Sequence, residues 1–143
     1  MTVGRSPYCG CLYYAANALA RKVTRMAEEV FRPTGLPPSH GFIVMTVNKQ
    51  PGITAGEIAE VMQLQPSTVT RLVDRLEDEG FLTRQTDGKY IRMLPTAKAT
   101  RLDAGLRLAW QNLYKRYAAL LGEQSSRDLT GSIYEAAVRL GDG

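Results

Sequence analysis

Short hydroxyl side chains and guanidinium groups are concentrated in one stretch of the chain, residues 67–75. They are Ser67, Thr68, Thr70, Arg71 and Arg75. Hydroxyl side chains fit close to a phosphate backbone, and arginine pairs with guanine through two hydrogen bonds in the major groove. Apolar residues in and after this stretch recur at helical spacing: Val69, Leu72, Val73 and Leu76. The stretch is therefore predicted to be a helix that packs on one side and reads DNA with the other.

A predicted β-hairpin follows this helix and adds further cations. Residues 81–85 and 90–94 are β-prone, and Asp87-Gly88 between them favours a tight turn. The cations are Arg84, Lys89 and Arg92, which are expected near the phosphate backbone or the minor groove. Asp74 and the acidic residues 77–79 favour the alternative of a merely solvated helix. They lie toward its C-terminal end, however, away from where base contacts usually form.

Apolar periodicity and helix breakers predict the elements that must position these side chains. The predicted helices span residues 11–31, 38–50, 55–62, 67–79, 97–121 and 127–140. Thr54 and Glu57 form a capping box before the third helix, Pro66 begins the fourth, and Thr96 can cap the fifth. A short capped helix, a turn, a second helix and a hairpin follow one another as in a winged helix-turn-helix. The predicted fold is mainly α with an α+β hairpin: a winged helix-turn-helix with flanking dimerisation helices.

Three segments of one compact chain follow from this order. They are an N-terminal dimerisation helix in 1–37, a winged DNA-binding domain in 38–95 and C-terminal dimerisation helices in 96–143. The first and the last two helices carry long apolar stripes that a small DNA-reading domain has no room to cover. A second copy of the chain is therefore the expected partner. A two-fold homodimer predicts double-stranded, pseudo-palindromic operator DNA with half-sites about one helical turn apart.

Several segments resemble the multiple antibiotic resistance regulator (MarR) family. They are Gly35–Ser39, Pro51–Thr54, Glu57–Ala59, Pro66–Glu77 and Gly80–Arg84, of which Pro66–Glu77 is the most specific. The resemblance covers the chain from about residue 11 to 140. It implies an obligate homodimer that regulates transcription, most often as a repressor, under control of a small-molecule or oxidant signal. It also implies that the polar residues of the 67–75 stretch contact the operator.

The predicted wing departs from that family. The family's wing usually carries an acidic residue and, two positions later, an arginine that enters the minor groove. Here the tip reads Thr86-Asp87-Gly88-Lys89, with no arginine at its apex. Lys89 or Arg84 is the candidate substitute for this contact.

Cys9 and Cys11 lie at or just before the first predicted helix. A thiol at a helix N-terminus ionises more readily, and the thiolate is the reactive form. Residues 9–13, Cys-Gly-Cys-Leu-Tyr, are similar to the Cys-x-x-Leu-Tyr setting of the organic hydroperoxide-sensing branch of the family, so a thiol-based redox sensor is one alternative. The others are small apolar fillers, a Cys-Cys-His metal site with His40, and a thiol enzyme. The enzyme ranks last because no base or orienting acid stands nearby in the sequence.

Aromatic residues on the flanking helices are candidates for an effector site. The resemblance implies that effectors bind between those helices and the winged domain. The aromatic residues there are Tyr13, Tyr14, Trp110, Tyr114 and Tyr117, and the candidate site comprises Tyr13 and Trp110 with His40 as a polar neighbour of the dimer helices. The alternative is that the aromatics belong to the dimer core, as residues at helical spacing usually do. A winged helix that binds a protein instead of DNA is a further alternative, which the short wing would allow.

The net charge of +4 does not come from the predicted DNA-reading domain. Residues 41–95 hold six basic and seven acidic residues. The DNA hypothesis therefore rests on where the basic residues lie within this segment and not on its net charge. We expect selective, strongly salt-dependent binding. No apolar run reaches the roughly 18 residues of a membrane span, and no signal-peptide pattern begins the chain. The expectation is a cytoplasmic protein that is not an enzyme and needs no metal or other cofactor.

Overall fold

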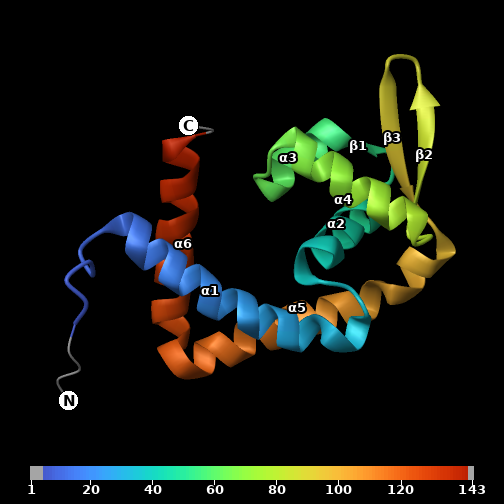
Figure 1. The fold of residues 1–143 in the computed structure, drawn as a ribbon. Helices are drawn as coiled ribbons and strands as arrows, with labels where there is room; N and C mark the ends of the chain where they lie inside the picture. Colours follow the sequence, from blue (N-terminus) through green and yellow to red (C-terminus); the bar gives the residue numbers. More distant parts are fainter. Residues whose placement is uncertain (1–4, 142–143) are drawn as a thin grey trace. The chain divides into compact units, whose positions relative to one another are not determined.

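The computed structural model describes residues 5–141 and confirms a mainly helical winged helix-turn-helix (Figure 1). The helices are α1 (Leu12–Phe31), α2 (Pro38–Lys49), α3 (Ala55–Met62), α4 (Pro66–Asp78), α5 (Ala97–Leu121) and α6 (Glu123–Leu140), with a 3-10 helix η1 at Arg32–Thr34. The strands are β1 (Ile53–Thr54), β2 (Leu82–Asp87) and β3 (Tyr90–Pro95). The chain divides into two compact units: unit 1 comprises residues 1–29 and 111–143, and unit 2 comprises residues 30–110.

The helix-turn-helix of unit 2 begins and ends where its sequence predicts. The Glu57 N–H donates to the Thr54 hydroxyl at 3.2 Å, and the Thr54 N–H donates to Glu57 Oε1 at 3.1 Å. This capping box starts α3, and the bond from the Thr54 backbone is the main cause of the lowered pKa of Glu57. Gln63, in the left-handed region at φ 51°, turns the chain toward Pro66 at the start of α4. Gly80, at φ +83°, follows the end of α4.

The hairpin belongs to a three-stranded antiparallel sheet in the order β1-β3-β2. The sequence did not predict β1, because two residues are too few to show an alternating pattern. The two hairpin strands run one or two residues farther than predicted and end with Asp87 opposite Tyr90. The turn is therefore Gly88-Lys89, one residue later than the predicted Asp87-Gly88. Gly88, at φ +61°, supplies the left-handed conformation that a two-residue hairpin turn needs.

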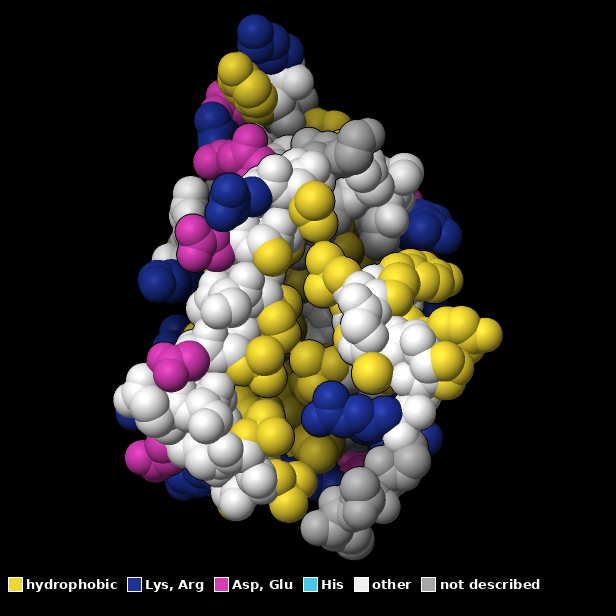
Figure 2. All heavy atoms as spheres, turned by 90° about the vertical axis from the view of Figure 1, so that its left-hand side faces the viewer, with side chains coloured by type: hydrophobic (Ala, Val, Ile, Leu, Met, Phe, Trp, Pro, Cys, Tyr) yellow, Lys and Arg dark blue, Asp and Glu magenta, His cyan; other side chains and the backbone are white. Residues whose placement is uncertain are grey.

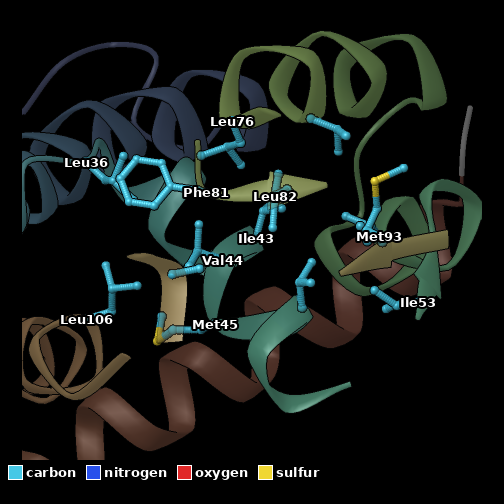
Figure 3. Close-up of a cluster of buried hydrophobic side chains, with 14 of the residues drawn as sticks. Leu36, Ile43, Val44, Met45, Ile53, Leu76, Phe81, Leu82, Met93 and Leu106 are labelled. Carbon is cyan, nitrogen blue, oxygen red and sulfur yellow. The ribbon is translucent and has the colours of Figure 1, made fainter. Parts of the chain in front are cut away.

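Unit 2 has a hydrophobic core to which α2 contributes Ile43, Val44 and Val47, all completely buried. Figure 3 shows side chains from α4, α5 and the sheet meeting those of α2. Gly41 permits close packing here, because a Cβ at this position would lie 2.9 Å from Phe31 Cε2. This core holds α4 and the base of the hairpin in fixed positions.

The limits of unit 2 differ from those of the segment 38–95 that the sequence suggested. Phe31 and Leu36, which precede residue 38, pack into the core of unit 2. Leu106 and Ala109, from the first half of α5, pack there as well. Both long helices α1 and α5 therefore contribute to the winged unit as well as to unit 1.

Unit 1 consists of most of α1, the second half of α5 and α6. The buried residues in its described part are Ala27, Leu113, Ala118 and Ser126. Arg116 Nη1 lies 2.6 Å from Glu29 Oε2, and the rings of Tyr114 and Tyr117 pack edge-on with centroids 5.6 Å apart. Large apolar side chains along α1 and α6 are exposed: Leu12, Tyr13, Leu129, Ile133, Tyr134, Val138 and Leu140. Figure 2 looks onto the side where these helices lie and shows a strip of apolar side chains.

The helix limits α1 to α5 agree with the predicted ranges within one residue, whereas α6 begins at Glu123 and not at 127. Gly122, at φ +93°, ends α5 and is at the same time the N-cap of α6. Its carbonyl accepts the Ser126 N–H at 3.0 Å. Within residues 5–141, no helix combines the length and apolar character needed to cross a membrane.

Candidate nucleic-acid interface

One side of α4 is buried and the opposite side is exposed. Val69, Val73 and Leu76 are buried as predicted, and Leu72 is half-buried. Thr68, one of the five predicted contact residues, is also half-buried. The other four are exposed and form what we call the polar face of α4: Ser67, Thr70, Arg71 and Arg75. The helix therefore has the division into two sides that a groove-binding helix requires.

The first turn of α4 is suited to an anion. The N–H groups of Thr68 and Val69 donate to the Gln65 carbonyl at 3.0 and 3.1 Å. Pro66 carries no N–H, so the group in this turn that can hold a phosphate is the N–H of the exposed Ser67, helped by the helix dipole. The Thr70 hydroxyl donates to the Pro66 carbonyl at 3.0 Å, so its oxygen remains available as an acceptor.

Two arginines stand on the polar face. Within residues 5–141, Arg71 makes no ion pair. Arg75 Nε lies 3.1 Å from Glu79 Oε1, but the Arg75 side chain is 71% exposed. An exposed pair at this i,i+4 spacing contributes only about 0.3–0.5 kcal/mol, so a DNA phosphate can displace Glu79. Arg71 and Arg75 line one open hollow together with Asp74, Asp78 and Glu79.

The third arginine near this surface, Arg84 of β2, is held by the acidic side chains of α4. Its Nη2 donates to Asp74 Oδ1, and its Nε lies 3.3 Å from Glu77 Oε1. From its sequence position, Arg84 is predicted to contact DNA. The structure places its guanidinium between these two carboxylates, beside the C-terminal half of α4.

The tip of the wing is organised by Arg92. Its Nε donates to Asp87 Oδ2 at 2.8 Å, and its Nη1 donates to the Gly52 carbonyl at 3.1 Å. The bond with Asp87 is the main cause of the raised pKa of Arg92. Lys89 Nζ lies 5.4 Å from the centroid of the exposed Tyr90 ring and has no ion pair among the described residues. Of the three wing cations, Lys89 is therefore the one whose charge is uncompensated.

His40 is the third residue of α2, at a helix start as predicted. Both of its ring nitrogens are buried and have no hydrogen-bond partner in the described part of the chain. Burial lowers the pKa of His40, while Glu79 opposes this shift and Arg75 adds to it. The imidazole is therefore neutral at pH 7.

The cysteines lie in unit 1 and are exposed. Cys9 belongs to a turn in which its N–H donates to the Ser6 carbonyl at 3.1 Å. Cys11 directly precedes α1, and its carbonyl accepts the Ala15 N–H at 3.0 Å. Tyr13 is exposed on the first turn of α1. Across residues 5–141, no three His, Cys, Asp or Glu side chains gather into a group that could hold a metal ion.

Trp110, the other candidate effector residue, lies in unit 2 at the end of an aromatic row. Its ring packs edge-on against Phe42 with centroids 6.0 Å apart, and Phe42 lies 5.6 Å from Phe31. The Trp110 side chain is about half exposed. It therefore offers an aromatic surface at the edge of the core.

Sequence reasoning missed the supporting role of two residues at the start of α5, Thr96 directly before the helix and Lys98 in its first turn. Lys98 Nζ donates to the Glu79 carbonyl at 2.8 Å and lies 4.4 Å from the centroid of the Phe81 ring. The Thr96 hydroxyl donates to the Gly80 carbonyl at 2.7 Å. These contacts join the end of α4 and the start of the hairpin to α5. The signal for Thr96 was its helix-capping position, but nothing in the sequence indicated Lys98.

Comparison with known proteins finds the same fold. Residues 36–89 match the family model of the MarR family. The HTH-type transcriptional repressor MdtR of Bacillus subtilis (strain 168) is 31% identical over 78 residues, which are 54% of this chain and 50% of MdtR. The chain thus matches only about half the length of this curated relative.

Solved structures resemble nearly the whole chain. The transcriptional repressor CouR bound to a 23-mer DNA duplex has a TM-score of 0.83 and 18% identity, over 96% of this chain and 99% of CouR. The S. aureus MepR–DNA complex has a TM-score of 0.76 and 15% identity, over 96% of this chain and 99% of the MepR chain. At such identities the likeness establishes the fold.

Proposed function

Because residues 36–89 of this chain are a MarR family domain, we propose that the protein is a dimeric transcriptional regulator that binds operator DNA in the cytoplasm and acts as a repressor. The observation that carries the proposal is the division of α4, whose buried stripe fixes the helix while its polar face is exposed. The function is regulation by binding, so no catalytic group is needed.

In this proposal the polar face of α4 enters the major groove. Arg71, free of ion pairs among the described residues, is the base-reading side chain, and Arg75 leaves Glu79 for a base or a phosphate. Ser67, Thr68 and Thr70 position the helix N-terminus on the phosphate backbone. Lys89 at the wing tip contacts the neighbouring backbone and takes the place of an arginine at the apex.

The exposed apolar residues of α1 and α6 support the homodimer. Ile133 is 47% exposed and Leu129 is 40% exposed, although both follow the helical spacing of a packed stripe. A contiguous apolar strip of this kind marks an interaction surface (Figure 2). A two-fold dimer would present two copies of α4 to a pseudo-palindromic operator.

The direct test is DNA binding by Arg71→Ala. Duplexes selected from a random library by the wild type define the operator, and fluorescence anisotropy then measures affinity over a series of salt concentrations. We expect affinity to fall about 100-fold, because each of two subunits loses roughly 1–3 kcal/mol of base contact. Lys115→Ala, an exposed cation of unit 1, is the control and should bind as the wild type does.

A winged helix that binds only proteins predicts a different result. The wild type would then select no sequence, and its retention on DNA would not vary with salt. That outcome would overturn the regulator proposal.

The signal that releases the repressor is the second part of the proposal. The exposed Cys9 and Cys11 favour an oxidant, whereas Tyr13, Trp110 and His40 are the candidates for binding a small-molecule effector. Operator affinity is measured with and without peroxide, in the wild type and in Cys9→Ser/Cys11→Ser. Redox control predicts weaker binding of the oxidised wild type alone. Equal affinities in all four samples would contradict it and favour a small-molecule signal.

A further inference from the structure

The acidic residues of α4 stand close to the surface that is proposed to face DNA. Asp74 lines the same open hollow as Arg71 and Arg75, and its side chain is 53% exposed. Glu77, three residues farther along the helix, is 38% exposed. Unpaired carboxylates at these positions would repel phosphates and weaken DNA binding.

Both carboxylates are engaged by one cation from the wing. Nη2 of Arg84 in β2 donates to Asp74 Oδ1, and Nε of the same side chain lies 3.3 Å from Glu77 Oε1. Two nitrogens of one planar guanidinium, each facing a different carboxylate, fix its orientation as well as its distance. The arrangement links the first half of β2 to the C-terminal half of α4, two elements that also contribute Leu76 and Leu82 to the same core.

We propose that Arg84 is a positioning residue: it neutralises Asp74 and Glu77 and fixes the wing relative to α4, and it does not itself contact DNA. This inference rests on the proposed function. It replaces the expectation that the positive charge of Arg84 is directed at the phosphates. The wing then delivers one uncompensated cation per subunit, Lys89, to the DNA.

The sharpest test removes the acidic partners and leaves the cation. If Arg84 positions the wing, Asp74→Asn/Glu77→Gln weakens operator binding about three- to tenfold, because the tie is lost. If Arg84 is a DNA contact, the same variant binds more tightly, because two negative charges near the phosphates are gone and Arg84 is released. The two roles thus predict changes of opposite sign. Unchanged or tighter binding would overturn the proposal.

A second measurement concerns the salt dependence of binding. Arg84→Gln should lower the affinity at fixed salt about tenfold and leave the slope of log affinity against log salt unchanged, since no phosphate contact is lost. The matched variant Lys89→Gln, which removes the proposed backbone contact of the wing, should reduce that slope by about 1.8, or about 0.9 for each of two subunits. An equal reduction in Arg84→Gln would assign Arg84 to the phosphates and refute the positioning role.

Amide hydrogen exchange tests the tie without DNA. We expect faster exchange at Thr83–Gln85 of β2 in Asp74→Asn/Glu77→Gln and in Arg84→Gln, with unchanged exchange in the core helix α2. Unchanged exchange in β2 would overturn the inference even if the wild type binds its operator. If the wild type binds no duplex and the β2 exchange still rises, the proposed function fails while the structural tie stands.

Discussion

The two halves of α5 differ in what becomes of their apolar side chains. In unit 2, Ala99, Leu106 and Ala109 are buried, with Leu106 completely inaccessible. In unit 1, Leu113 and Ala118 of the same helix are still buried, but Leu120 and Leu121 at its end are 71% and 47% exposed. The same helix therefore packs into a closed core at its start and presents apolar side chains to solvent at its end.

The first helix repeats the contrast in the opposite direction. Phe31 at the end of α1 is completely buried in unit 2, whereas Leu12 at its start is 67% exposed in unit 1. Both stripes have the helical spacing of core residues, so the pattern alone does not distinguish them. What differs is the presence of packing elements around them: unit 2 supplies its own, whereas the stripe of unit 1 is left exposed, and in the proposed function a second chain covers it. The stability of unit 1, unlike that of unit 2, should depend on protein concentration.

The largest effect is expected from a charge placed in the exposed strip of unit 1. Ile133→Asp would bury an unpaired carboxylate in the proposed dimer interface. We expect the wild type to have the mass of two chains in light scattering and the variant the mass of one. Operator affinity should fall more than about 100-fold, because the two half-sites are no longer bound together.

The control for this variant comes from unit 2. Val61 of α3 is 59% exposed, so Val61→Asp makes the same chemical change on a surface without the proposed contact. Its mass should remain that of two chains. A wild type with the mass of a single chain, or an Ile133→Asp variant that still pairs, would remove the distinction between the units.

The next largest effect concerns the closed core. Ile43 is completely buried in unit 2, and Ile43→Ala should lower the free energy of unfolding by about 2–5 kcal/mol. In urea titrations this loss should be the same at all protein concentrations. The loss caused by Leu129→Ala should instead shrink on dilution. Equal concentration dependence of both losses would mean that the core of unit 2 is also completed by a second chain.

The sequence predicted those parts of the fold that rest on local rules. The capping box at Thr54 and the glycine at position 80 mark helix ends directly, because each acts through its own backbone geometry. The predicted start of α6 was wrong, because Gly122 both ends α5 and is the N-cap of α6, and a glycine has no polar side chain that would mark a cap in the sequence. β1 was missed since its identity as a strand depends on pairing with β3, far along the chain.

The candidate interface divides in the same way. The exposure of Arg71 and Arg75 follows from helical spacing, which the sequence contains. The engagement of Arg84 by Asp74 does not, because the two residues meet only when the hairpin folds back beside α4. From the sequence alone, Arg84 looks like a free cation, because its partners are not known. In the folded chain its charge is neutralised by Asp74 and Glu77.

A smaller effect is expected from the cap of α3, a local feature of unit 2. Thr54→Ala removes the hydroxyl that accepts the Glu57 N–H and should lower the free energy of unfolding by about 1 kcal/mol. Thr54→Ser keeps the acceptor and should retain most of the stability. Urea unfolding measures both. An equal loss in the serine variant would assign the effect to the lost methyl group, not to the cap.

The smallest effect is expected from His40, and it has a defined sign. Burial holds the folded-state pKa of His40 below its ordinary value of 6.5, so the unfolded chain takes up the proton first as the pH falls. The stability from the neutral imidazole is present above pH 6.5 and is lost as the pH falls from there toward the lower folded-state pKa.

His40→Leu should remove this loss and cost little at pH 7, because neither ring nitrogen has a partner among the described residues. Urea unfolding at pH 7 and pH 5 measures the difference, and His40→Gln serves as a polar variant that does not titrate. If the wild type and both variants lose equal stability between these pH values, other groups of unit 2 control its acid sensitivity. If the leucine variant has a much lower free energy of unfolding than the wild type at pH 7, the imidazole makes a contact, such as one with water, that stabilises the fold.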